Sequence, residues 1–125
     1  MTAEKKTGLA RIVAAYGYSL NGLRSTWRSE AAFRQECLLA VFLLPEALWL
    51  GDTAIQKSLL IFVVLLVLVV ELLNSAIEAA IDRIGPERHD LSAHAKDAGS
   101  AAVFISMLAA GIVWLLMIME RSGLL

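Results

Sequence analysis

The chain has 125 residues, of which 58% are hydrophobic and only 18% are charged, against about a quarter charged in a typical soluble domain. This length allows one domain, and the polar side chains are too few to cover it in water, so the composition argues against a soluble globule and against disorder. A net charge of −1 and a single cysteine argue against a nucleic-acid partner, an internal disulfide and a multi-cysteine metal site.

The first predicted element is an amphipathic surface helix over residues 8–28. Its apolar residues recur at helical spacing along one face, and arginines occupy the other faces. This composition is typical of a helix that lies in a membrane interface, with guanidinium groups toward lipid phosphates. A helix packed on protein is the alternative, and both descriptions hold if the helix covers a bundle. The apolar positions are Leu9, Ile12, Val13, Tyr16, Leu20, Leu23 and Trp27.

Three apolar segments follow, and they predict transmembrane helices at about residues 30–50, 55–82 and 91–119. The third is the firmest, because Ala98–Met119 carries no charge and gives a helix of about 33 Å, against a hydrocarbon core of about 30 Å. The predicted fold is therefore an all-α membrane protein of one domain, residues 1–125, with an interfacial helix and three spans.

The basic residues fix the orientation of these spans. Nine of the eleven precede or enter the first span or lie near the connector between the second and third spans. This distribution predicts a cytoplasmic N-terminus and a C-terminus on the opposite side. The nine are Lys5, Lys6, Arg11, Arg24, Arg28, Arg34, Arg83, Arg88 and Lys96, against Lys57 and Arg121.

The second span ends in an unexpected polar face. Glu71, Asn74 and Glu78 are spaced i, i+3, i+7 and share one side of a helix, bordered by Ser75 and Asp82. Because an acid in a membrane segment costs at least a few kcal/mol, these groups call for a compensating partner. Carboxylate and amide oxygens suit Mg²⁺, which also takes phosphate oxygens. The alternative is that the acids pair with basic side chains of neighbouring helices.

The spacing of the two glutamates suggests a reaction. Glu78 lies nearer the cytoplasm and Glu71 about 10 Å deeper, so a phosphate-bearing substrate could meet a metal at Glu78 while a hydroxyl group meets Glu71 as general base. Glu30 could supply a second metal carboxylate, or could form an i, i+4 salt bridge with Arg34.

The start of the third span adds candidate nucleotide contacts. Lys96 can neutralise phosphate and Asp97 can accept from a sugar or an adenine amine, although both also fit a solvated helix start. His89 and His94 are too few for a zinc site without thiols. The chain has no GxxxxGK[ST] or GxGxxG motif, so any nucleotide is held without the usual phosphate loops.

The stretch Glu71–Asp82 resembles the signature of the bacterial integral-membrane diacylglycerol kinases, with Ile81 in place of a valine. The similarity covers nearly the whole chain apart from the termini and residues 38–57. Matching stretches are Arg11, Gly17-Tyr18-Ser19, Gly22-Leu23-Arg24, Trp27, Glu30 to Glu36, Asp82 to Gly85 and Ala95 to Ala102.

The resemblance implies a homotrimer in the bacterial cytoplasmic (inner) membrane, with a periplasmic C-terminus and active sites shared between subunits. It implies transfer of the γ-phosphate of ATP to diacylglycerol, giving phosphatidic acid. Undecaprenol is the acceptor of some relatives and remains an alternative. Two other classes also remain open: a proton- or ion-conducting protein, which the lack of acids in the outer half opposes, and a structural or regulatory subunit.

The resemblance also assigns roles to residues. Glu71 would be the general base on the lipid hydroxyl, Glu30 and Glu78 would hold the divalent ion that bridges the ATP phosphates, and Asn74 and Asp82 would support these groups. Nucleotide contacts would come from Arg11, Tyr18, Glu30, Glu78, Glu87, Arg88, His89, Lys96 and Asp97. Lipid contacts would come from Arg11, Tyr18, Ser19, Arg24, Trp27, Arg34, Gln35, Glu71 and Ser100.

Overall fold

The computed structural model describes residues 4–125, so the first three residues of the predicted domain lie outside it. Four α-helices contain most of the described residues: α1 (Gly8–Ser29), α2 (Ala31–Leu50), α3 (Ala54–Ile84) and α4 (Asp90–Arg121). No strand occurs among residues 4–125, which confirms the predicted all-α class.

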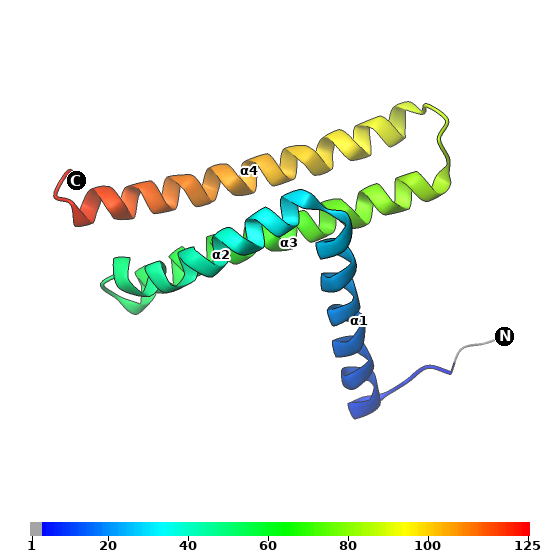
Figure 1. Cartoon of the computed structure of the whole chain (residues 1–125), viewed down its shortest axis with the longest axis horizontal. Coiled ribbons are helices and arrows are strands. Elements are labelled where there is room, and N and C mark those ends of the chain that lie inside the picture. The colour runs from blue at the N-terminus through cyan, green and yellow to red at the C-terminus, as the bar shows by residue number, and fades with distance from the viewer. Residues whose placement is uncertain (1–3) are drawn as a thin grey trace.

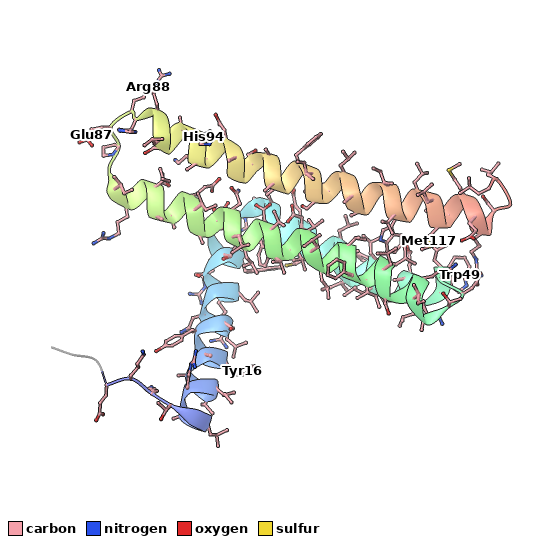
Figure 2. The ribbon with its side chains drawn as sticks, turned by 180° about the vertical axis from the view of Figure 1, so that it is seen from behind. Tyr16, Trp49, Glu87, Arg88, His94 and Met117 are labelled. Carbon is pink, nitrogen blue, oxygen red and sulfur yellow. The ribbon has the colours of Figure 1, made fainter. Side chains whose placement is uncertain are left out.

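Helices α3 and α4 form a long antiparallel hairpin, and α2 lies along α3 on the half that contains the C-terminus (Figure 1). Near the middle of α3 the chain turns between α1 and α2, and α1 runs steeply away from the hairpin. Tyr16 on α1 accordingly lies well away from α4 in Figure 2. This arrangement suits an amphipathic helix in a membrane surface beside a bundle that crosses the membrane.

Two of the described helices, α3 with 31 residues and α4 with 32, are long and apolar enough to cross a membrane. Large apolar side chains on both are exposed in the single subunit, among them Phe62 and Phe104. Lipid or another protein surface has to cover such side chains. Helix α2 is not among these candidate spans, because its 20 residues include three charged ones, Arg34, Glu36 and Glu46. The fold therefore supports a membrane protein with two candidate spans.

The corner between α1 and α2 is set by a single extended residue. Glu30 has φ −117° and ψ 108°, which ends one helix and starts the next. The Arg34 guanidinium donates from Nη1 to the carbonyl oxygens of Trp27 at 2.7 Å and Arg28 at 3.2 Å. These bonds satisfy carbonyl groups that the end of α1 leaves free. Arg34 therefore caps α1 and forms no salt bridge with Glu30.

The packed core lies at the end of the hairpin far from the α3–α4 connector. Ala47, Leu50 and Leu60 are buried there, and side chains of α4 including Trp114 and Met117 pack against them. The Trp114 indole donates from Nε1 to the carbonyl oxygen of Leu60 at 3.3 Å, which ties α4 to α3. Figure 2 shows Met117 and Trp49 at this end.

The turn between α2 and α3 is closed by a capping box. Thr53 Oγ1 accepts from the Gln56 backbone N–H at 3.2 Å, and Gln56 Oε1 accepts from the backbone N–H groups of Asp52 and Thr53 at 2.8 and 3.4 Å. These reciprocal bonds satisfy donors at the start of α3. Gly51 is required just before the turn, because a Cβ there would lie 2.8 Å from the backbone N of Lys57.

Candidate functional site

The polar face of α3 lies where α2 and α4 pack against it. Glu71 and Asn74 are buried, with 5% and 9% of their surfaces exposed, and Glu78 is half-buried. The Asn74 amide donates from Nδ2 to Glu78 Oε1 at 3.3 Å. Three polar groups therefore occupy the protein-facing side of a predominantly apolar helix, and two of them, Asn74 and Glu78, are hydrogen-bonded to each other.

Glu71 has acidic rather than basic neighbours. The carboxyl groups of Glu30, Glu36 and Glu78 all lie close enough to that of Glu71 to interact with it electrostatically. The ion pairs that form within residues 4–125 use aspartates at other positions. The alternative in which these acids pair with basic side chains of neighbouring helices is therefore realised for Asp82, which pairs with Lys96 of α4, whereas neither Glu71 nor Glu78 forms a salt bridge with the described residues 4–125.

Glu36 on α2 is the acidic neighbour that the sequence pattern did not single out as a site residue. Both of its carboxyl oxygens are buried without a hydrogen-bond partner, and the group faces the Glu71 carboxyl. Glu36 also lines a cavity of about 340 Å³ whose other walls are apolar side chains of α2, α3 and α4. The available signal was an acid inside an apolar segment, but the group that Glu36 faces depends on how α2 packs on α3.

Helix α4 brings a basic side chain to the polar end of the hairpin. Lys96 Nζ lies 2.7 Å from Asp82 Oδ1, and both side chains are partly exposed. The Lys96 ammonium is also close enough to Glu78 to attract it. Asp97 and Ser100 lie on the same helix, and both residues are exposed. A cation therefore stands beside Glu78 on the side that faces the connector, where an anionic group could approach.

The corner between α1 and α2 forms an open cleft of about 450 Å³. Arg24 and Arg28 line it together with apolar and aromatic side chains, including Trp27 and Phe33. Gln35 is exposed nearby on α2. Cationic groups beside an apolar wall complement an amphipathic lipid, which presents an anionic or polar headgroup beside apolar chains.

The predicted site residues on α1 stay apart from the polar face of α3 within one subunit. Arg11, Tyr18 and Ser19 are exposed on a helix that runs away from the hairpin (Figure 1). Arg11 lies more than five turns before Glu30, which is about 28 Å along a helix. One subunit alone therefore does not bring these residues to Glu71.

The connector residues Glu87, Arg88 and His89 lie beyond the last turn of α3. Glu87 and Arg88 are at the tip of the hairpin in Figure 2, and all three side chains are exposed. The His89 imidazole accepts at Nδ1 from the Leu91 backbone N–H at 3.1 Å and thereby caps the start of α4. The connector thus presents exposed charged side chains beyond Asp82.

The carboxylates of Glu30 and Glu78 could bind a divalent cation, with the protein providing only some of the cation's ligands. Glu30 and Glu78 are half-buried, lie near Glu71, and offer the oxygen ligands that Mg²⁺ prefers. No group of three or more His, Cys, Asp or Glu side chains among residues 4–125 could hold a metal by itself. Since Mg²⁺ commonly takes one or two carboxylates and completes its shell with water and phosphate, these residues fit a cation that arrives with a nucleotide.

Known proteins match this chain over nearly its whole length. The family model described as prokaryotic diacylglycerol kinase matches residues 17–118. A diacylglycerol kinase of Haemophilus influenzae is 54% identical over 110 residues, which cover 88% of this chain and 93% of that protein. A diacylglycerol kinase of Escherichia coli K12 is 50% identical over 121 residues, covering 97% and 99%. A diacylglycerol kinase of Pseudomonas aeruginosa is 52% identical over 109 residues, covering 87% and 89%.

Proposed function

The chain belongs to the prokaryotic diacylglycerol kinase family, and we propose that it transfers the γ-phosphate of ATP to the hydroxyl group of diacylglycerol, giving phosphatidic acid. The observation that carries this proposal is the buried polar face of α3, with Lys96 of α4 beside it. Phosphoryl transfer needs positioning and charge neutralisation more than covalent help from protein, so a few carboxylates and a cation are sufficient equipment.

Glu71 is the proposed general base. It is buried within a candidate membrane span, and no cation among residues 4–125 forms a salt bridge with it. As the hydroxyl oxygen attacks the γ-phosphorus, the Glu71 carboxylate accepts the hydroxyl proton. The bond between the γ-phosphorus and the β,γ-bridging oxygen breaks, and ADP leaves.

Glu30 and Glu78 are the proposed ligands of Mg²⁺. The ion, when bound with ATP, supplies positive charge that neutralises the phosphate oxygens. Asn74 supports this role because its amide holds the Glu78 carboxylate from one side. Asp82 supports it less directly, since it holds the Lys96 ammonium in place.

The remaining nucleotide contacts come from the polar end of the hairpin and from α1. Lys96 is proposed to meet a phosphate group and Asp97 to accept a hydrogen bond from the sugar or base. The exposed connector side chains can reach the same nucleotide. The full proposed set is Arg11, Tyr18, Glu30, Glu78, Glu87, Arg88, His89, Lys96 and Asp97.

The lipid acceptor is proposed to enter along the corner between α1 and α2. The cleft lined by Arg24 and Trp27 has the amphipathic character that a glycerolipid requires, and it lies beside the corner that Glu30 forms. The contact of Arg34 with the end of α1 keeps this corner in shape. The proposed contacts are Arg11, Tyr18, Ser19, Arg24, Trp27, Arg34, Gln35, Glu71 and Ser100.

The assembly is proposed to be a homotrimer with three spans per subunit, α2, α3 and α4, and with α1 in the interface. Support comes from the exposed apolar side chains of the hairpin and from the distance between the α1 residues and Glu71 within one subunit. A neighbouring subunit would complete the site. The basic residues support a cytoplasmic N-terminus and a periplasmic C-terminus in a bacterial inner membrane.

A direct assay tests the activity. The purified protein, in detergent micelles that contain dioleoylglycerol, should transfer ³²P from [γ-³²P]ATP to a lipid product that migrates as phosphatidic acid, and chelation of divalent cations should stop the transfer. Labelled product at the level of a protein-free control would contradict the proposal.

The same assay with undecaprenol in place of dioleoylglycerol distinguishes the two lipid acceptors. We expect the rate with dioleoylglycerol to exceed that with undecaprenol. The reverse ranking would assign the chain to undecaprenol phosphorylation and leave the phosphoryl-transfer chemistry unchanged.

A further inference from the structure

Gly99 of α4 packs directly on the polar face of α3. The residue is buried, and the space that its side chain would fill is already occupied by Asn74. A Cβ atom at position 99 would overlap Asn74 Oδ1 and would lie 3.4 Å from Asn74 Cγ and 3.8 Å from Ile77 Cδ1. The Asn74 amide can therefore occupy this position against α4 only because residue 99 has no side chain.

This contact constrains the Asn74 amide at both ends. Its nitrogen donates to Glu78 Oε1 at 3.3 Å, while its oxygen, Oδ1, is buried without a conventional hydrogen-bond partner among residues 4–125. The Gly99 C–H that points in the Cβ direction faces Oδ1, and Cα–H···O contacts of this kind recur where helices pack closely. The close approach of Gly99 and the bond to Glu78 together fix which way the amide points.

We propose that Gly99 is a positioning residue for phosphoryl transfer: its lack of a side chain leaves room for the Asn74 amide to hold the Glu78 carboxylate in the orientation that the cation and nucleotide require. This inference rests on the function proposed for Glu78. It assigns a role to α4 beyond supplying Lys96 and Asp97, because Gly99 of α4 also affects the orientation of the Glu78 carboxylate on α3.

An added methyl group should damage the site more than the fold. The atom it meets is the end of the Asn74 side chain rather than backbone, so rotation of the amide relieves the overlap without separating the helices. Lys96, three residues before Gly99 on α4, should keep its ion pair with Asp82 of α3. Alanine also favours a helix over glycine. The Gly99→Ala substitution should therefore weaken mainly the hydrogen bond between Asn74 and Glu78.

The first test compares Gly99→Ala with Gly111→Ala. Both glycines lie on α4, but a Cβ at Gly111 meets no atom within 4 Å. We expect Gly99→Ala to lower kcat by about 10- to 100-fold and to raise the Mg²⁺ concentration for half-maximal rate, because small misplacements of positioning groups have effects of this size. Gly111→Ala should match the wild type, and both variants should elute at the wild-type position in size-exclusion chromatography. Equal kinetics for the two variants would overturn the proposal.

The second test asks whether Gly99 acts through Asn74. Affinity for Mn²⁺ in the presence of a non-hydrolysable ATP analogue is measured by the loss of the free-ion electron paramagnetic resonance signal. Gly99→Ala should weaken binding several-fold in the native background and by less than about twofold in an Asn74→Ala background, since two groups that act as one unit are not additive. Equal losses in both backgrounds would indicate a general packing role and refute the inference.

Two further outcomes also decide the matter. If Gly99→Ala misfolds as a single variant but folds when combined with Asn74→Ala, the result would support the contact that the proposal requires. Misfolding of both the single and the double variant would contradict the proposal. A wild-type protein that fails to phosphorylate diacylglycerol would refute the proposed function itself, a result separate from any difference between the glycine variants.

Discussion

The two ends of the α3–α4 hairpin are built from opposite kinds of contact. At the end that contains the C-terminus, Leu60 is fully buried in an apolar core, and Arg121 donates to the carbonyl oxygens of Trp49 and Leu50. The Arg121 guanidinium carbon, Cζ, also lies 4.3 Å from the centroid of the Trp49 ring, and Arg121 Nη1 lies 3.3 Å from Asp52 Oδ1 in an ion pair. This end is closed by apolar packing and satisfied polar groups.

The part of the hairpin from its middle to the connector is closed in a different way. The buried side-chain oxygens without partners among residues 4–125 belong to Glu36 and Asn74, which flank Glu71. Buried groups of this kind cost stability unless they gain a partner. The comparison indicates that the apolar end supplies stability, which offsets the cost of the buried polar groups without partners near Glu71.

The largest expected effect on activity without a loss of stability comes from Glu71→Gln. Removal of the base should lower kcat by about 10³-fold, within the usual range for general-base catalysis, while the melting temperature in micelles stays at or above that of the wild type. Steady-state kinetics and thermal denaturation followed by circular dichroism measure the two effects. Glu46→Gln, at an exposed position on α2, is the matched control and should change neither. Full turnover by Glu71→Gln would remove the base assignment.

The converse change is Leu60→Ala at the apolar end. Deleting the side chain leaves a cavity in the packed core and should lower the free energy of unfolding by about 3 kcal/mol, with kcat per folded molecule unchanged. Unfolding in mixed micelles provides the measurement. Leu59→Ala, next in sequence but 40% exposed, should cost much less. A similar cost for both leucines would show that this end is not the main packed core.

The cations at the two ends should also behave differently. Lys96→Met removes the ammonium beside Glu78 and should raise KM for MgATP about tenfold, equivalent to about 1.4 kcal/mol of binding free energy. Arg121→Met should leave KM unchanged and lower stability instead, because its contacts are structural. Initial rates over a range of MgATP concentrations test both. The assignment of Lys96 to the nucleotide fails if its variant shows the KM of the wild type.

The smallest expected effect comes from the turn at the apolar end. Thr53→Ala removes the oxygen that accepts from Gln56 and should cost about 1 kcal/mol of stability with no loss of activity. Thr53→Ser keeps the hydroxyl group and serves as control. Chemical denaturation of the two variants measures the difference, and an alanine variant as stable as the serine variant would show that this cap adds little.

Features that depend on one helix at a time were predictable. The apolar runs predicted an all-helical chain, and the i, i+3, i+7 spacing of Glu71, Asn74 and Glu78 was sufficient to place these residues on a common face. Such inferences hold because helical periodicity is local and needs only the sequence between the residues concerned. The similarity to known kinases over nearly the whole chain confirmed the family.

Features that join helices were not predictable in the same way. Sequence spacing offered Arg34 as a salt-bridge partner of Glu30, whereas the structure uses it to cap α1. Lys96 pairs with Asp82 across the connector, and Glu36 faces Glu71 from another helix. Each of these contacts depends on the rotation and register of one helix against the next.

The residue pattern was therefore sufficient to establish a helical chain of low charge content with an acidic face in an apolar segment. The packing of the helices was needed to show that Glu36 of α2 faces Glu71 and that Gly99 of α4 contacts Asn74. The physical reason is that periodicity fixes directions within a helix, whereas the distance between helices follows from the sum of their side-chain contacts and turns.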